Sequence, residues 1–222
     1  MSPPRIADLF CCEGGAAMGY YRAGFEVVGF DIEPQRRYPF EFRQADIMGF
    51  DGHESFWREE FDAIHASPPC QSYSNMSNRH GSDELELIDE TRALLQATGL
   101  PWIIENVTGA RSHMWSPMAL HGGQLGMRVY RPRLFESNVL LTPPPKASPP
   151  KDAVAVYGRK EDHRRLWTRK DGTKLRAASL EEAREAMEMP WASWNGCREA
   201  IPPAYTEWIG TQLLQHLGER KP

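Results

Sequence analysis

The sequence predicts an α/β fold in which helices cover both faces of a mostly parallel sheet. Short apolar runs alternate along the chain with segments of helical periodicity, the order expected of βαβ units. A glycine pair follows the first apolar run, and the polar residues Asp31, Cys70 and Glu105 come at or after the ends of later ones. Because the ends of parallel strands share one edge of a sheet, these groups are expected where open α/β sheets bind ligands.

The length and composition fit one compact domain, or one domain that carries a small insertion. The chain has 222 residues, 41% of them hydrophobic and 25% charged, close to the averages for globular proteins. Four cysteines are too few for a disulfide scaffold, and no Cys/His set has the spacing of a zinc site. No long apolar run occurs, including at the start of the chain. We therefore expect a soluble, cytoplasmic monomer that holds no metal and contacts no membrane.

The first βαβ unit has the order of a nucleotide-binding site. Residues 6–10 predict a strand, Gly14 and Gly15 a turn, and the residues up to Gly24 a helix. Residues 27–30 predict a second strand that ends at Asp31, about 20 residues after the turn, where an acid can bond a ribose. The turn lacks the spacing G-x-G-x-x-G, so an ordinary βα turn is the alternative.

Two further strands are predicted to deliver reactive side chains. Residues 61–66 lead into Ser67-Pro68-Pro69-Cys70-Gln71, where two prolines fix the backbone in front of a cysteine. Its thiolate is a candidate nucleophile, and a buried structural cysteine is the alternative. A helix is predicted from Ser82 to Gly99. The strand after it, residues 102–104, leads to Glu105, a candidate proton donor or clamp for a base edge; a solvated loop glutamate is the alternative.

The second half of the chain is basic and rich in proline. Residues 128–135 predict an edge strand on which Arg131 and Arg133 share a face and can grip an anion or a carbonyl, unless they are ordinary surface arginines. Five prolines fall within residues 143–150. Residues 146–176 hold ten Lys/Arg against four Asp/Glu in a chain of net charge −4. This asymmetry favours a polyanionic partner, with a solvated charged loop as the alternative.

Two helices are predicted near the C-terminus, and with them the chain divides into three parts. Ser179 and Glu182 form a capping box for a short helix, and Pro202-Pro203 opens a longer one. We expect residues 1–142 to bind the donor and catalyse, residues 143–178 to be a Pro-rich linker with a short basic target-recognition region, and residues 179–222 to pack back on the first part.

Taken in order, these segments resemble the DNA cytosine-5 methyltransferase family. Asp8-Leu9-Phe10 with Gly14-Gly15, Gly29-Phe30-Asp31-Ile32 and Gln44-Ala45-Asp46-Ile47 are similar to its donor-binding motifs. Its catalytic motifs are matched by Pro68-Pro69-Cys70-Gln71, Glu105-Asn106-Val107 and Arg131-Pro132-Arg133, and its last two by residues 180–190 and 200–203. The resemblance implies an S-adenosylmethionine-dependent methyltransferase (Rossmann-like) fold and a small, phage-like member with a reduced recognition region.

The resemblance also implies a mechanism and a set of site residues. Cys70 would attack carbon 6 of a flipped cytosine, Glu105 would bond ring nitrogen 3 and the exocyclic amine, Arg133 would contact the base carbonyl, and Arg131 would orient the loop or a phosphate. S-adenosylmethionine would lie against Phe10, Cys12, Glu13, Gly14, Gly15, Asp31, Ile32, Asp46, Ile47, Pro69, Ala200 and Ile201. Double-stranded DNA would be contacted by Gln71, Ser72, Arg159, Lys160, Arg164, Arg165, Arg169 and Lys170.

The chain departs from the family pattern at several places. Cys11-Cys12 replaces Ala-Gly, Val129 stands where glutamine is usual, and Arg198-Glu199 replaces Gly-Asn before Ala200. Only 46 residues separate Arg133 from Leu180, which predicts a very short recognition sequence or loose specificity. An RNA cytosine methyltransferase, a non-catalytic DNA-binding relative, and an unusual donor or transferred group are the alternatives.

Overall fold

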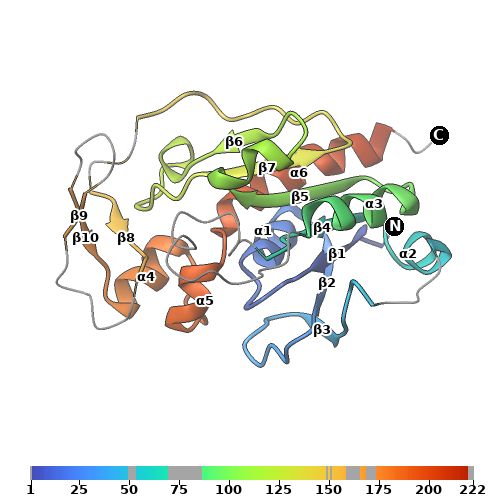
Figure 1. Ribbon diagram of the computed structural model, residues 1–222, viewed down its shortest axis with the longest axis horizontal. Helices are drawn as coiled ribbons and strands as arrows, with labels where there is room; N and C mark the ends of the chain where they lie inside the picture. The colour runs from blue at the N-terminus through green and yellow to red at the C-terminus, as the bar shows by residue number, and fades with distance from the viewer. Residues whose placement is uncertain are drawn as a thin grey trace.

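A seven-stranded sheet forms the centre of the molecule, and a separate three-stranded sheet lies at one end (Figure 1). The computed structural model describes residues 2–49, 54–69, 87–148, 150, 152–158, 166–168 and 174–219. In spatial order, the strands of the main sheet are β3 (Glu41–Gln44), β2 (Glu26–Asp31), β1 (Arg5–Leu9), β4 (Ala63–Ala66), β5 (Trp102–Val107), β7 (Arg133–Ser137) and β6 (Met118–Leu120).

Strand direction and order place a ligand site at one edge of this sheet. The five strands from β3 to β5 run parallel, whereas β7 runs antiparallel between β5 and β6. The chain moves outward from β1 through β2 to β3 and then returns to the other side of β1 with β4. The reversal between β1 and β4 is the switch point at which ligands bind, outside the carboxyl ends of the strands.

Helices cover both faces of the main sheet, as predicted, because alternate strand residues point to opposite sides. On one face, Ile6 and Ile103 pack into a hydrophobic core with α1 (Gly15–Ala23) and α6 (Pro203–Glu219). On the other face, their neighbours Ala7 and Ile104 pack into a second core with α2 (Glu54–Glu60) and α3 (Ile88–Thr98). Within the described residues, no helix combines the length and the apolar character needed to cross a bilayer.

The smaller sheet and two short helices lie to the left of α1 in Figure 1. Strands β8 (Val154–Ala155), β10 (Lys174–Ala177) and β9 (Leu166–Thr168) make up this sheet in that order. Figure 1 places α4 (Leu180–Met187) and α5 (Trp194–Glu199) between it and α1. The predicted capping box starts α4: the Ser179 hydroxyl accepts from Glu182 N at 3.2 Å and the Glu182 carboxylate accepts from Ser179 N at 3.0 Å. The remaining short helices are η2 (Thr108–His113) and η3 (Gly122–Leu125).

Three sequence-based expectations about elements are corrected. Helix α3 begins at Ile88, later than the predicted start at Ser82, which lies outside the described residues. The strand expected over residues 128–135 begins only at Arg133, and it is an inner strand because β6 pairs with its outer side. Strand β3 and helix α2 lack a clear periodic signal and were not predicted.

Candidate active site

A tight turn after β1 lies at the switch point and is built from left-handed backbone. Phe10, Cys12 and Gly14 have φ values of 57°, 46° and 81°, a conformation that costs free energy in residues other than glycine. A Cβ on Gly14 would lie 2.8 Å from Pro39 Cδ, and a Cβ on Gly15 would overlap the Ile201 carbonyl oxygen. The glycine pair is therefore required by the close approach of two other segments.

Asp31, at the end of β2, anchors this turn. One carboxylate oxygen accepts from Cys12 N at 3.0 Å, and the other accepts from Glu33 N at 3.0 Å. Each carboxylate oxygen has two lone pairs, so each can still accept from a ribose hydroxyl. The side chain is buried, which fixes its orientation beside the turn.

The other residues expected to bind a donor lie around the same edge. Ile32 is 58% exposed and offers an apolar surface next to Asp31. The Asp46 carboxylate accepts from Met48 N at 3.1 Å and remains exposed, whereas the Ile47 side chain is buried in the core on the α2 face. The glycine cradle, the acidic group and the exposed apolar surface together fit an adenosine-containing donor.

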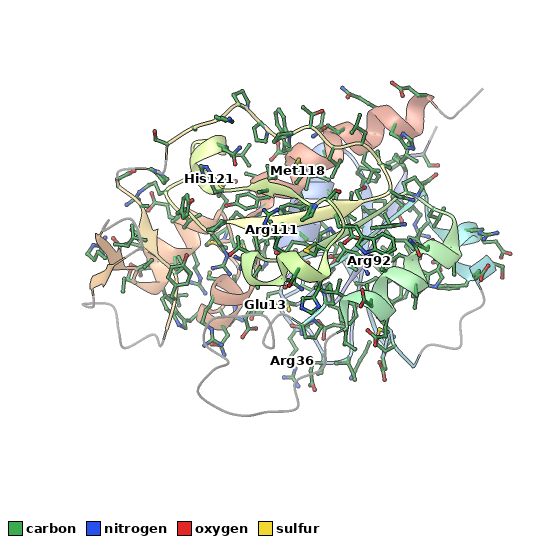
Figure 2. The ribbon with its side chains drawn as sticks, turned by 45° about the horizontal axis from the view of Figure 1, so that its top comes forward. Glu13, Arg36, Arg92, Arg111, Met118 and His121 are labelled. Carbon is green, nitrogen blue, oxygen red and sulfur yellow. The ribbon has the colours of Figure 1, made fainter. Side chains whose placement is uncertain are left out.

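Glu13 contacts the C-terminal segment. Its carboxylate accepts from Ser193 N at 2.6 Å and from the Ser193 hydroxyl at 2.5 Å, and its carbonyl accepts from Trp191 Nε1 at 2.7 Å. Figure 2 shows Glu13 beside the helices of this segment. The contacts keep Ala200 and Ile201 against Gly15, where the predicted far wall of the donor site belongs.

Glu105 lies inside β5 at the same edge and is 6% exposed. Arg133 Nε lies 2.9 Å from Glu105 Oε1, and the Ser67 hydroxyl is close enough to the carboxyl group to lower its pKa. The Arg133 contact is an ion pair without hydrogen-bond alignment, because Oε1 has no hydrogen-bond partner among the described residues. Burial raises the pKa of Glu105, and the Arg133 charge opposes this rise. Glu105 is therefore easier to protonate than a solvated glutamate.

Asn106, which the sequence analysis did not single out, joins β5 to the segment that follows β4. Its side-chain amide donates to the Pro68 carbonyl at 3.1 Å in a buried position. Pro69, the last described residue before the predicted nucleophile, is exposed. The asparagine of the E-N-V sequence thus holds the backbone at Pro68, the first residue of the P-P-C-Q sequence. Its place next to Glu105 was the only sequence signal for this role.

Arg131 does not share a strand face with Arg133, contrary to the prediction. It precedes β7 with a φ of 31° and is 2% exposed. Its guanidinium donates to the Ala200 carbonyl at 2.7 Å and to the Arg198 carbonyl, while the Tyr205 hydroxyl donates to the Arg131 carbonyl at 2.9 Å. Burial and the nearby Arg133 charge lower the pKa of Arg131 to about 10. Arg131 therefore clamps residues 198–200 through their backbone, which makes the side chains of Arg198 and Glu199 unnecessary for this contact.

Several predicted site residues lie outside the described residues. These are the expected nucleophile Cys70 and the expected DNA-contacting residues Gln71, Ser72, Arg159, Lys160, Arg164, Arg165, Arg169 and Lys170. In the part of the chain that is described, no group of three or more His, Cys, Asp or Glu side chains could hold a metal ion.

Three solved structures with similar folds are described as methyltransferases. A protein described as a DNA modification methyltransferase encoded within a prophage of E. coli aligns with a TM-score of 0.68 and 16% identity, over 97% of this chain and 99% of that one. The Entamoeba histolytica methyltransferase EhMeth gives 0.60 and 12% over 99% of both chains. The S. pombe Dnmt2 methyltransferase gives 0.62 and 11% over 96% and 99%. At these identities the likeness establishes the fold, a Rossmann-like fold of S-adenosylmethionine-dependent methyltransferases.

Sequence comparison assigns the family. A search of curated proteins found no match. The sequence model of the family described as C-5 cytosine-specific DNA methylase matches residues 4–118, slightly more than half of the chain. The match contains the turn after β1, the end of β2 and the buried Glu105. The chain therefore belongs to the C-5 cytosine-specific DNA methylase family.

Proposed function

We propose that this protein is a DNA (cytosine-5-)-methyltransferase that acts on a flipped cytosine through a covalent bond to Cys70. The observation that carries the proposal is the buried Glu105 carboxyl, held beside Arg133 and Ser67 at the edge where β4 leads into Pro68-Pro69-Cys70. A polar cluster with these hydrogen-bonding groups matches the edge of a cytosine ring better than it matches a solvated loop.

The chain's own residues account for activation of the base. Carbon 5 of cytosine is a poor nucleophile until a thiolate adds to carbon 6, and Cys70 supplies that thiolate. Glu105, in its protonated form, donates to ring nitrogen 3 and accepts from the exocyclic amine, which stabilises the charge that develops on the ring. Arg133 contacts the base carbonyl and holds Glu105 in place. Arg131 keeps the neighbouring backbone of residues 198–200 in position.

S-adenosylmethionine, the donor implied by the family, supplies an electrophilic methyl group. We place its ribose on Asp31, its adenine near Phe10 and Ile32, and its remaining part against the turn that contains Gly14 and Gly15. Pro69 lines the path of the methyl group. After transfer a base removes the proton from carbon 5, and the Cys70 sulfur leaves carbon 6.

We assign the parts of the chain as residues 1–142 for donor binding and catalysis, 143–178 for target recognition and 179–222 for closing the donor site. The contacts of Glu13, Gly15 and Arg131 with residues 191–201 support the third assignment. Because a duplex buries the target atom in its base stack, the cytosine must be flipped out. The basic segment of residues 146–176 is the proposed source of phosphate contacts.

The test is transfer of labelled methyl groups from S-adenosylmethionine to DNA and RNA panels by the wild type and Cys70→Ala. The proposal predicts 5-methylcytosine in DNA, formed by the wild type and absent from the variant. Transfer to RNA alone would assign the protein to the RNA cytosine methyltransferases. Transfer that persists in Cys70→Ala would remove the covalent mechanism, and donor binding without transfer to any substrate would favour a non-catalytic relative.

A further inference from the structure

A chain of polar side chains leads from Tyr20 on α1 through His65 and Ser67 to Glu105, through the interior of the protein. The Tyr20 hydroxyl lies 2.9 Å from His65 Nδ1, and His65 Nε2 lies 3.0 Å from the Ser67 hydroxyl oxygen. The Ser67 hydroxyl is in turn close enough to the Glu105 carboxyl group to lower its pKa. Tyr20 and His65 are both 0% exposed. The mechanism proposed above gives no role to Tyr20 or His65, and none to Ser67 beyond its place beside Glu105.

Strand register explains why these four groups meet. On β4, His65 lies opposite Ile103 of β5, and Ala66 lies opposite Ile104. The next residues, Ser67 and Glu105, therefore come side by side. Since residues two apart on a strand share a face, His65, Ser67 and Glu105 all point toward α1. Helix α1 places the Tyr20 ring against the His65 ring, with centroids 5.3 Å apart.

The imidazole at the centre of the chain is neutral, because burial lowers the pKa of His65 to about 3. A neutral imidazole has one donor nitrogen and one acceptor nitrogen. When Glu105 is a carboxylate, Ser67 donates to it, His65 Nε2–H donates to Ser67, and Tyr20 donates to His65 Nδ1. When Glu105 is protonated, it donates to Ser67, Ser67 donates to Nε2, and Nδ1–H donates to Tyr20. No proton is gained or lost along the chain beyond the one on Glu105.

We propose that Tyr20, His65 and Ser67 are positioning residues that keep Glu105 hydrogen-bonded in both of its protonation states. A buried carboxyl group without such partners would be held in one state by its surroundings. With the chain, Glu105 can take up and release a proton without losing its contact to Ser67. That proton uptake and release serve catalysis rests on the proposed role of Glu105 against the base. The arrangement of Tyr20, His65, Ser67 and Glu105 does not depend on that role.

Charged and titratable groups surround the chain on several elements. Glu105 faces Arg133 on β7, Arg131 in the segment before β7, Tyr20 on α1 and Tyr205 on α6. Asp8 on β1 lies opposite His65 and faces Tyr20. The two arginines favour the carboxylate form of Glu105 and burial opposes it. The Ser67 contact favours the carboxylate further, so its removal should raise the pKa of Glu105.

The first test is the pH dependence of methyl transfer in the wild type, Ser67→Ala and Ser67→Thr. Because Glu105 works protonated, the rate falls on the alkaline side as Glu105 loses its proton. Ser67→Ala should move that limb upward by about one pH unit, because a hydrogen bond to the carboxylate is stronger than one to the neutral carboxyl group by about that equivalent. Ser67→Thr retains a hydroxyl group and should restore the wild-type profile.

The matched control is Ser137→Ala on β7, which removes a hydroxyl that donates to the Trp102 carbonyl at 2.8 Å, away from Glu105. It should leave the pH profile in place even if it lowers stability. An unchanged alkaline limb in Ser67→Ala, in an enzyme that still transfers methyl groups, would overturn the proposal and leave the proposed function standing.

A second test needs no turnover: nitrogen-15 NMR of the His65 ring across a pH titration. The chain predicts that the neutral ring changes from the Nδ1–H to the Nε2–H tautomer as Glu105 ionises, and that Ser67→Ala abolishes the change. A fixed tautomer in the wild type, or a change that survives in Ser67→Ala, would overturn the proposal. The predicted change in a protein that methylates nothing would support the chain and count against the proposed function.

Discussion

The side chain of Asp31 connects the first two strands of the sheet to the proposed donor site. Its two oxygens hold the backbone of Cys12 and Glu33, so it both shapes the turn after β1 and presents unused lone pairs at the ligand edge. A carboxylate anchored from two sides keeps its orientation when a ribose arrives. Its contribution to donor affinity should therefore be large for a single residue.

Asp31→Ala should weaken S-adenosylmethionine binding about ten- to a hundred-fold, the equivalent of one charge-assisted hydrogen bond, and change DNA affinity little. Isothermal titration calorimetry measures the first effect. Asp62→Ala is the control, because Asp62 likewise accepts from a backbone N–H, that of Arg5 at 2.8 Å, but at the opposite end of the strands. Equal donor affinity in the wild type and Asp31→Ala would remove Asp31 from the ribose role.

The buried Asp8 is expected to make the stability of the fold depend on pH. Burial, opposed by a hydrogen bond from Tyr38 and reinforced by the charge of Asp31, raises the pKa of Asp8 well above 3.8. A raised folded-state pKa means that the protonated form stabilises the fold fully below about pH 4, and that this contribution is lost as the pH rises toward the folded-state value.

Asp8→Asn, which cannot ionise, should therefore gain in melting temperature relative to the wild type as the pH rises from 4 to 7. Thermal unfolding followed by circular dichroism at several pH values measures the difference. A gap between wild type and variant that is constant over this range would show that Asp8 does not titrate with the predicted linkage.

The positions of some site residues could be predicted from the sequence, whereas the contacts of others could not. The positions of Asp31 and Glu105 at the ligand edge followed from strand ends, which a periodic pattern reveals. The clamp of Arg131 could not be predicted, because its acceptors are the backbone carbonyls of residues 198 and 200, and backbone groups carry no sequence signature. The contact of Glu13 could not be predicted either, because its partner Ser193 is 180 residues away in the sequence.

Helices α1 and α6 approach each other so closely that one glycine decides their packing. A Cβ on Gly19 of α1 would overlap the Pro203 carbonyl and the Thr206 hydroxyl of α6. The Thr206 hydroxyl also donates to the Ala16 carbonyl at 2.8 Å. Because α6 follows directly after Ala200 and Ile201, this contact sets the position of the segment against Gly15.

Gly19→Ala should lower the free energy of unfolding by about 1–3 kcal/mol, the usual effect of an added methyl group in a packed interior. Urea denaturation measures it. Gly218→Ala near the end of α6 is the control, since a Cβ there meets nothing within 4 Å, and alanine favours a helix over glycine. A Gly19→Ala protein as stable as Gly218→Ala would mean that α1 and α6 are not in close contact.

The elements were predicted well where amphipathic patterns were long and poorly where pairing partners decided the outcome. Helix α6 starts at Pro203 and buries Tyr205, Ile209 and Leu213 as its periodicity predicts. Strand β3 has four residues, none of them buried, so it carries no hydrophobic signal and exists because it pairs with β2. Strand β7 became an inner strand for a similar reason, since three residues of β6 complete its outer side.

On the scale of the whole molecule, positive charge is concentrated in one part of the sequence. The net charge is −4, yet residues 146–176 carry a local excess of six positive charges. The strands of the smaller sheet, β8, β9 and β10, lie within or just after this segment, at one end of the molecule (Figure 1). The proposed DNA contacts at Arg164, Arg165 and Arg169 fall between these strands in the sequence.

Replacing Arg164, Arg165 and Arg169 together with glutamine should flatten the salt dependence of DNA binding. Each lost phosphate contact lowers the slope of log affinity against log salt concentration by about 0.9. Fluorescence anisotropy with labelled duplex at several salt concentrations measures the slope, and donor affinity should stay at its wild-type value. An unaltered slope would place the DNA-binding surface elsewhere.

The central claim is that Cys70 attacks a cytosine that Glu105 activates, and the most direct measurement is covalent trapping. Wild type, Cys70→Ala and Glu105→Gln would be incubated with S-adenosylmethionine and DNA that contains 5-fluorocytosine, whose carbon 5 has no proton to release. Peptide mass spectrometry should find DNA bound to Cys70 in the wild type, none in Cys70→Ala, and a much slower adduct in Glu105→Gln. An adduct on another residue, or a wild-type protein that methylates cytosine in DNA without forming one, would contradict the account.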